Sequence, residues 1–520
     1  MNKQNIYDFY EVSLNLSTKT YANPFDVNVI CEVMKPNGEN FSISVFYCGN
    51  DTFKARIYTD SQGTYSYKIS LDGKELSSGE FECIKNEKNH GKPMIAPYNS
   101  QKLCYQDGKA YNMLGFECDW IFLLDQDNEN DFPKAKCIID DIAKNGFNMI
   151  VCNVIAMDVT WQEGLQGKGT QYDFTNPKEL PFEKNDDKIN HDMLNPHFFA
   201  RMDKIMDYLK EKEIVVHLMI YVWNKYVDWA EIGSDADNRY YKHIVDRYQA
   251  YPNLIWDVSK EALAYGKITT EGLQEKCTFI RENDKYGTLL TMHDAGFCQH
   301  NKDFVDIVSV QNWANNLGSS MFALQHNNLG RVVCNVEHGG YERGLFEGFH
   351  GAYSDPKVCL ERNYICLFMG IYGVYYWQNA SWNIVVWDIN SFAREMRPRY
   401  DYYKYLRQFM DEHSYENLRP LNPDDPTRFA LTDGKKVYIY KPIGARYITG
   451  IARTFPHPEK ELSWYNVQTG EYKNVKFRIN KKIYGFECPW FEEPAILIYE
   501  QQEEKDREVL KPVLSFELEQ

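Results

Sequence analysis

The sequence lacks three features that would place the chain in a familiar class. It has no basic excess, since 58 Lys and Arg stand against 74 Asp and Glu, for a formal net charge of -16. It has no apolar run long enough for a membrane span or a secretory leader. Its 13 cysteines form no CxxC pair and no Cys/His zinc spacing. We therefore expect a cytoplasmic protein with reduced thiols, without a nucleic-acid partner, a membrane partner, a metal or another cofactor.

Aromatic residues, in contrast, are abundant. They make up 15% of the chain, with 38 Tyr and 11 Trp. Core and interface packing explains most rings of this kind, but surfaces that stack on sugar rings are also rich in them. Together with the acidic charge, this composition favours a neutral or small polar ligand such as a carbohydrate.

A chain of 520 residues is long enough for two to four domains. Residues 1–95 show short alternating runs separated by turn signals such as PNGEN and DSQG, which predict an Ig-like antiparallel β-sandwich. Residues 96–415 alternate apolar runs with amphipathic segments, the pattern of a parallel sheet covered by helices. Residues 416–520 return to short strands and predict a small antiparallel β domain with a charged tail.

The middle segment contains eight candidate strands, which predict an α/β fold of the (β/α)8 TIM-barrel type. The strands are expected at 111–116, 147–154, 214–221, 253–258, 287–293, 306–311, 331–336 and 370–377. An open doubly wound sheet would carry a glycine fingerprint after its first strand, and YNMLGFECDW has none. The glycine cluster at 164–169 falls in the long loop after the second strand, which makes a phosphate-binding role a poor fit.

Barrel chemistry lies at the C-terminal ends of the strands. Here those ends are polar, acidic and aromatic, without a serine nucleophile elbow, which favours a pocket for a neutral polyol. The candidate site residues are Asp119, Trp120, Trp223, Lys260, Glu261, His293, Gln311, Trp313, Glu337, Tyr341 and Trp377.

Two of these candidates are carboxylates that close apolar strands. Glu261 follows NLIWDV and Glu337 follows RVVCNV, 76 positions later. Three barrel steps of roughly 25 residues cover that separation, so we expect them on the fourth and seventh strands. Glycoside hydrolysis needs such a pair, one acid to protonate the leaving oxygen and one carboxylate to meet the oxocarbenium-like centre.

Several segments resemble known enzymes. YPNLIWDVSKEAL and RVVCNVEHGGYE are similar to the fourth-strand and seventh-strand segments of retaining clan A glycoside hydrolases. GFECDW, NGFNMI and the terminal WYNVQTGEY resemble the apiosidase-like family, in which a β-sandwich precedes the barrel and a small β domain follows it. The resemblance implies a retaining glycosidase with Glu261 as acid/base and Glu337 as nucleophile. It also implies Trp377 as a platform beneath the sugar, although core packing is an alternative role for so large a ring.

The sequence departs from the clan pattern at two positions. Lys260 stands where relatives keep an asparagine; a lysine there could bind an acidic or 2-substituted sugar, or pair with Asp257 or another acid. The sixth strand lacks the tyrosine that orients the nucleophile in the clan, and either Gln311 or Tyr341 could replace it. His293 and Asp119 are candidates for binding sugar hydroxyls.

Two other function classes were weighed against this interpretation. A metal-dependent hydrolase fits poorly, because His217 and His293 form no HxH or HExxH pattern. A non-catalytic carbohydrate-binding protein on a decayed barrel stays open as an alternative. We expect an exo-acting enzyme for small glycosides, while the sugar, the linkage and the oligomeric state, a homo-oligomer included, stay open.

Overall fold

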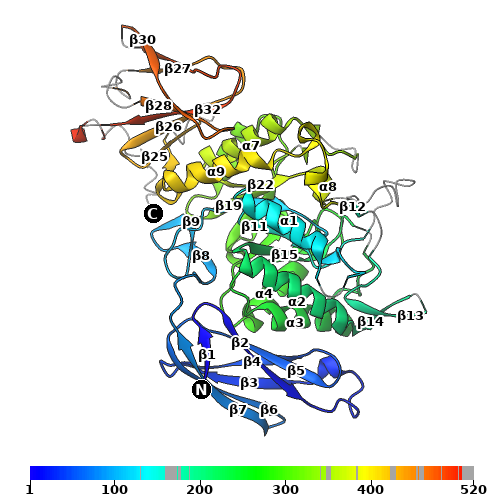
Figure 1. The fold of residues 1–520 in the computed structure, drawn as a ribbon. Helices are drawn as coiled ribbons and strands as arrows, with labels where there is room; N and C mark the ends of the chain where they lie inside the picture. Colours follow the sequence, from blue (N-terminus) through cyan, green and yellow to red (C-terminus); the bar gives the residue numbers. More distant parts are fainter. Residues whose placement is uncertain are drawn as a thin grey trace.

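The computed structural model describes residues 1–520 except 129–130, 158–171, 174–176, 187, 226, 340, 347–352, 382–384, 422–428, 452–454, 456–461, 482, 502, 506 and 508–520. Figure 1 shows N-terminal strands, a central barrel with covering helices, and C-terminal sheets. The glycine cluster at 164–169 and most of the charged tail lie outside the described residues.

The N-terminal strands follow the alternation in the sequence, which gives each strand one buried face. In β3, for example, Val29, Cys31 and Val33 are buried whereas Glu32 is exposed. Residues 1–84, all of them described, form a seven-stranded sheet in the order β1-β7-β6-β3-β4-β5-β2. β1 runs parallel to β7, a pairing that the alternation did not predict. The strands are β1 (Asn2–Asn5), β2 (Phe9–Asn15), β3 (Val29–Met34), β4 (Asn40–Tyr47), β5 (Thr52–Tyr58), β6 (Gly63–Leu71) and β7 (Lys74–Ile84).

The middle region is the predicted barrel. Within the described residues, eight parallel strands follow one another in the order β17-β16-β15-β11-β10-β22-β19-β18. The barrel closes between β17 and β18, where the Asp306 amide donates to the Leu290 carbonyl at 2.8 Å and the Thr291 hydroxyl donates to the Ile307 carbonyl at 2.8 Å. The fold class expected from the sequence is confirmed. The strands are β10 (Gly115–Glu117), β11 (Met149–Asn153), β15 (Val215–Val222), β16 (Leu254–Lys260), β17 (Leu290–His293), β18 (Ile307–Gln311), β19 (Val332–Glu337) and β22 (Tyr372–Tyr376).

The sequences of these strands are largely apolar because both faces of each strand are covered. All residues of β15 and all residues of β16 are buried. Side chains that point inward fill the barrel, and those that point outward pack on the helices. A polar residue at the end of such a strand therefore marks the place where the strand leaves the core.

The covering helices begin at residues that the sequence marks clearly. Asn195 caps α2 and Pro196 is its first residue, and Thr269 caps α4 through the amide of Gly272. In the described part of the chain, no helix has the length and apolar character needed to cross a membrane. The helices are α1 (Pro133–Lys144), α2 (Pro196–Glu211), α3 (Asp235–Tyr248), α4 (Thr270–Asn283), α5 (Ala295–His300), α6 (Leu317–Asn327), α7 (Pro356–Phe368), α8 (Gln378–Ser381) and α9 (Tyr400–Glu412).

Short strand pairs extend the loops of the barrel. A hairpin of β8 and β9 leads from the N-terminal sheet into the barrel, and the pair of β20 and β21 follows directly after β19. These shorter strands are β8 (Pro93–Ala96), β9 (Asn99–Tyr105), β12 (Tyr172–Asp173), β13 (Phe182–Asn185), β14 (Lys188–Leu194), β20 (Tyr341–Glu342), β21 (Tyr353–Ser354) and β23 (Val385–Val386).

The C-terminal region is all β in its described part. One sheet has the order β24-β25-β26-β32-β28-β29 and a second has the order β27-β31-β30. The strands are β24 (Arg419–Pro420), β25 (Ala430–Thr432), β26 (Lys436–Lys441), β27 (Tyr447–Ile451), β28 (Leu462–Asn466), β29 (Tyr472–Asn474), β30 (Lys476–Asn480), β31 (Ile483–Glu487) and β32 (Ala495–Glu500).

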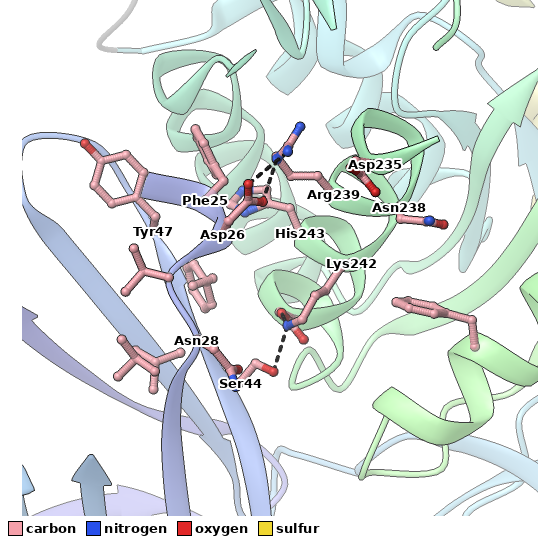
Figure 2. A pocket seen from close by; sticks show the side chains of 16 residues that line it. Phe25, Asp26, Asn28, Ser44, Tyr47, Asp235, Asn238, Arg239, Lys242 and His243 are labelled. Carbon is pink, nitrogen blue, oxygen red and sulfur yellow. Dashed lines mark hydrogen bonds and ion pairs between the residues drawn. The ribbon is translucent and has the colours of Figure 1, made fainter. Parts of the chain in front are cut away.

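The N-terminal sheet packs on helix α3 of the barrel. Figure 2 shows this junction, where the Asp26 carboxylate meets the Arg239 guanidinium and Lys242 reaches Ser44. The Arg239 Nε lies 2.6 Å from Asp26 Oδ1, and the Lys242 Nζ lies 2.9 Å from the Ser44 oxygen. These side chains line a cavity of about 380 Å³ between the two regions. The junction holds the sheet against the outer helices, away from the strand ends that carry the site.

Candidate active site

Glu261 and Glu337 stand at the C-terminal ends of two barrel strands. Glu337 is the last residue of β19, and Glu261 directly follows the last residue of β16. Because β17 and β18 lie between these strands and all run parallel, both carboxylates are at the same end of the barrel. The alternation of buried strand and polar strand end thus delivers both groups to the barrel mouth.

Glu261 has a left-handed backbone, with φ of 61°. This conformation costs a non-glycine residue roughly 1–2 kcal/mol. Two hydrogen bonds hold it, since the Glu261 amide donates to the His293 carbonyl at 3.0 Å and its carbonyl accepts from the Tyr265 amide at 3.1 Å. Backbone strain that is held in this way is frequent at functional sites.

Glu337 is buried and held at both carboxylate oxygens. Its Oε1 lies 2.9 Å from Lys260 Nζ and 3.3 Å from His293 Nε2. Its Oε2 accepts a hydrogen bond from Gln311 Nε2 at 2.8 Å. Side chains from β16, β17 and β18 therefore surround this carboxylate, and Gln311 donates a hydrogen bond to it. Gln311, one of the two residues considered for orienting Glu337, makes the contact.

Lys260 lies inside the site. Its ammonium is 1% exposed and contacts Glu117 Oε1 at 2.6 Å as well as Glu337 Oε1. Glu117 ends β10, which is three strands away from β16 in the barrel order. Lys260 thus pairs with acids other than Asp257, which is one of the possibilities that the sequence left open.

The two candidate catalytic glutamates have opposite electrostatic environments. Burial alone would raise the pKa of Glu337, but the ammonium of Lys260 and the donor His293 outweigh it and lower the pKa to about 2. Burial raises the pKa of Glu261, and the negative charge of Glu337 raises it further against the opposing effect of Lys260. One carboxyl is therefore held ionised while the other is biased toward its protonated form.

A buried aspartate beneath the site joins three strands. Asp257 Oδ1 accepts from the amides of Ser259 at 3.0 Å and His293 at 3.1 Å, and its Oδ2 lies 2.6 Å from His217 Nε2. The bond to His293 ties β17 to β16 at a residue four positions before Glu261. Asp257 thus positions the histidine that contacts Glu337.

A second buried ion pair lies beside Glu117. Lys225 Nζ is 3.3 Å from Asp119 Oδ2 and donates to the Ser381 carbonyl at 3.4 Å. The Ser381 hydroxyl donates to the Glu117 carbonyl at 2.6 Å. This network links the loop after β15, the end of β10 and helix α8.

Several polar atoms near these strand ends are buried without a hydrogen-bond partner among the described residues. They are Glu117 Oε2, both amide atoms of Asn153 and the hydroxyl of Tyr376. Buried polar groups in folded proteins are nearly always paired, and sugar hydroxyls can both donate and accept. These atoms are therefore suited to bind a polyol.

Aromatic rings line the same end of the barrel. Trp313 meets Tyr341 edge-on with centroids 5.1 Å apart, and Tyr341 lies 4.1 Å from Tyr376. Trp223 is partly buried and its indole donates to Ser259 Oγ at 3.0 Å. The first three rings form a separate apolar cluster outside the main core.

The other two predicted tryptophans pack more deeply. Trp120 is 5% exposed, at the start of a short 3-10 helix after β10. Trp377 is fully buried, lies edge-on to Tyr400 and donates from its indole to the Arg343 carbonyl at 3.3 Å. These contacts fit the alternative role of Trp377 in core packing.

No individual role was assigned from the sequence to Glu117, Asn153, Lys225 or Tyr376. Tyr376 precedes Trp377 at the end of β22, and Lys225 follows Trp223 by two positions. Their positions close to strand ends were the sequence signal that could have marked them as site candidates. Within the described residues, no three His, Cys, Asp or Glu side chains gather in a way that could hold a metal ion.

The fold is a parallel barrel with carboxylates at its strand ends, an arrangement that glycoside hydrolases use. A family model described as apiosidase-like, catalytic domain, matches residues 98–417, and the chain belongs to this family. A second model, a domain of unknown function named DUF5060, matches residues 3–72.

Solved structures share the fold over most of the chain. A candidate glycoside hydrolase from Bacteroides vulgatus ATCC 8482 has a TM-score of 0.77 and 18% identity, covering 96% of this chain and 100% of the other. A glycoside hydrolase family 5 protein from the same organism has a TM-score of 0.55 and 14% identity, covering 80% and 94%. A search of curated proteins gives no match. At these identities the likeness concerns the fold.

Proposed function

We propose that the chain is a retaining glycoside hydrolase in which Glu337 is the nucleophile and Glu261 the acid/base. The observation that carries this proposal is the pair of strand-end carboxyls whose environments shift their pKa values in opposite directions. Pairs of titratable groups separated in this way are typical of acid and base assignments in enzymes.

In the first step, a Glu337 oxygen attacks the anomeric carbon while the glycosidic C–O bond breaks. The proton of Glu261 moves to the leaving oxygen, so that an alcohol departs and a glycosyl ester of Glu337 forms. Gln311 and His293 hold the nucleophile in place during the attack. The raised pKa of Glu261 keeps the required proton available at the start.

In the second step, Glu261 acts as a base toward water. Once Glu337 is esterified its negative charge is gone, and the pKa of Glu261 falls because that charge had raised it. Water gives a proton to Glu261 and attacks the anomeric carbon, which releases the sugar and restores Glu337. Two inversions return the original configuration.

For the substrate we propose small glycosides, cleaved from one end in the cytoplasm. The polar atoms of Glu117, Asn153 and Tyr376 are buried at the strand ends, which suits a pocket closed around a terminal sugar. All 13 cysteines of the chain are free thiols, as is usual in a reducing compartment.

The experiment is turnover of a panel of aryl glycosides, with the anomer of the first product followed by NMR. Wild type should retain configuration. The kcat of Glu337→Ala should be more than ~10³-fold lower than that of wild type. Added azide should restore turnover and give a glycosyl azide of inverted configuration. Glu261→Ala should lose most activity on poor leaving groups and, with azide, give a glycosyl azide of retained configuration.

A matched control is Glu361→Gln. Glu361 lies on α7, where its carboxylate accepts from the Ile443 amide at 2.8 Å and from the Tyr440 hydroxyl at 3.3 Å. This variant should keep wild-type turnover. Full activity in Glu337→Ala, or inversion by wild type, would contradict the assignment. Sugar binding without turnover by wild type would favour the non-catalytic alternative.

A further inference from the structure

One ammonium group is shared between two carboxyl groups at the centre of the barrel mouth. Lys260 Nζ lies 2.6 Å from Glu117 Oε1 and 2.9 Å from Glu337 Oε1. All three side chains are at most 3% exposed. They come from β16, β10 and β19, so the contact exists only because the barrel closes.

A single positive charge cannot neutralise two buried carboxylates. Burial of an uncompensated charge costs several kcal/mol, so one of the two acids is favoured in its protonated form. Glu337 also lies beside His293 and accepts a hydrogen bond from Gln311. Glu117 Oε2, in contrast, has no hydrogen-bond partner within the described residues. The negative charge therefore belongs on Glu337 and the proton on Glu117. Consistent with this, burial together with Glu337 and Asp119 raises the pKa of Glu117 against the effect of Lys260.

The second lysine of the site is also engaged. Lys225 pairs with Asp119 at 3.3 Å, and both side chains are fully buried. Among the described residues, the charged and titratable groups around Lys260 and Glu337 are Glu261 after β16, His293 on β17, Glu117 and Asp119 at β10, Lys225 after β15, His338 after β19, Tyr341 on β20 and Tyr376 on β22. Together with Glu337 and Lys260 themselves, the site holds four carboxyl groups and two lysines.

We propose that Lys260 is a positioning residue: its ammonium, bridging Glu117 and Glu337, confines the negative charge of the site to Glu337 and makes the site selective for neutral sugars. The inference rests on the proposed function and concerns the same site. A sugar carboxylate entering the site would meet two lysines that already have acidic partners, and it would add a negative charge beside Glu337 and Asp119. A neutral sugar instead meets buried polar atoms that can pair with its hydroxyls.

The test is the pH dependence of kcat/KM for the best neutral aryl glycoside, in wild type, Lys260→Met and Lys260→Arg. The acid limb reports ionisation of Glu337 in the free enzyme. Removal of the positive neighbour favours the protonated acid, so Lys260→Met should move this limb upward by more than about 1 pH unit. Lys260→Arg keeps the charge, and its limb should stay near that of wild type.

Two further measurements separate this role from a purely structural one. Glu117→Gln removes the competing acid but leaves the ammonium beside Glu337, so its acid limb should stay at or below the wild-type position. In the double variant Glu117→Gln/Lys260→Met, no Glu117 carboxylate is left without its lysine partner, so folding is less affected. Its acid limb should still lie above that of wild type. A Lys260→Met enzyme that loses stability but keeps its acid limb would overturn the proposal.

Selectivity provides the second arm. Wild type should prefer neutral aryl hexosides to the matched aryl hexuronides by more than ~100-fold. The proposal would be overturned if wild type hydrolysed a uronide and Lys260→Met lost this activity selectively. Lys260 would then bind the substrate carboxylate. If wild type turns over no glycoside, or Glu337→Ala stays active, the proposed function fails. If both of those tests succeed and the Lys260→Met limb does not move, the charge-confining role alone fails.

Discussion

Arg56 of the N-terminal sheet and Asp203 of barrel helix α2 form an ion pair at the junction of the two regions. Arg56 Nη2 lies 2.5 Å from Asp203 Oδ2, and Arg247 of α3 binds the same carboxylate at 2.8 Å. The arginines are 3% exposed. Burial alone would raise the pKa of Asp203, but the two guanidinium groups hold it well below its usual range. One carboxylate thus binds guanidinium groups from both the N-terminal sheet and the barrel.

Asp203→Asn should destabilise the protein by about 3–5 kcal/mol, because it leaves the buried Arg247 guanidinium without its counter-ion and leaves Arg56 with only its ion pair to Glu11. Thermal unfolding with limited proteolysis of the junction measures the effect. The contribution of Asp203 is present above the pKa of the unfolded carboxyl and is lost as the pH falls toward its depressed folded value. Lys3→Ala, which removes an exposed pair with Glu82, should change stability by less than ~0.5 kcal/mol. Equal effects of the two substitutions would contradict this explanation.

Asp257→Ala should lower kcat about 10-fold as well as stability. The substitution leaves the amides of Ser259 and His293 without their buried acceptor, at roughly 1–3 kcal/mol each. His293 then loses its position beside Glu337. Asp257→Asn keeps an acceptor oxygen for both amides and should be milder. Steady-state kinetics on folded protein decides the matter, and a fully active Asp257→Ala enzyme would show that His293 is positioned by other contacts.

Glu342→Gln should alter how stability depends on pH. Burial raises the pKa of Glu342 to about 7 from an ordinary 4.5, although the Tyr375 hydroxyl and the Arg399 amide donate to it. The folded state therefore holds a proton that the unfolded state has lost, so this contribution is complete below about pH 4.5 and disappears as the pH rises through 7.

The neutral amide of Glu342→Gln mimics the protonated acid at every pH. The variant should match wild type near pH 4.5 and exceed its free energy of unfolding by up to ~3 kcal/mol above pH 8. Denaturant unfolding at pH 5, 7 and 8.5 gives the comparison. A constant difference between the two proteins across this range would show that Glu342 is not the titrating group.

Gly339→Ala should damage the barrel mouth. Gly339 has φ of 83°, and an added Cβ would lie 2.5 Å from the Trp313 Cα, so the backbone of Trp313 must move. Gly38→Ala is a matched control, because Gly38 has φ of 86° and open space around it. The control should cost roughly 1–2 kcal/mol from backbone strain alone. Gly339→Ala should cost more and lower kcat/KM, and identical thermal shifts would argue against the contact with Trp313.

Much of the fold could be predicted because its signals are local. Barrel strands such as β11 consist mainly of apolar residues and are buried on both faces, and turn or cap residues such as Asn195 and Pro196 mark where helices begin. The eight strands were located in this way, and with them the strand ends. The parallel pairing of β1 and β7 was not predicted, because pairing direction depends on which strands meet rather than on either strand's own pattern.

For the candidate site, too, local features could be predicted and long-range contacts could not. The sequence by itself determined that acidic and aromatic residues end the barrel strands, because strands that are covered on both faces are mostly apolar and the change to polar residues at their ends is local. Only the tertiary structure decided which of them meet. Lys260 joins Glu117 and Glu337 across separations of 143 and 77 positions, and Asp257 turns to His217 instead. Such partnerships follow from barrel closure, which brings strand ends together regardless of their distance along the chain.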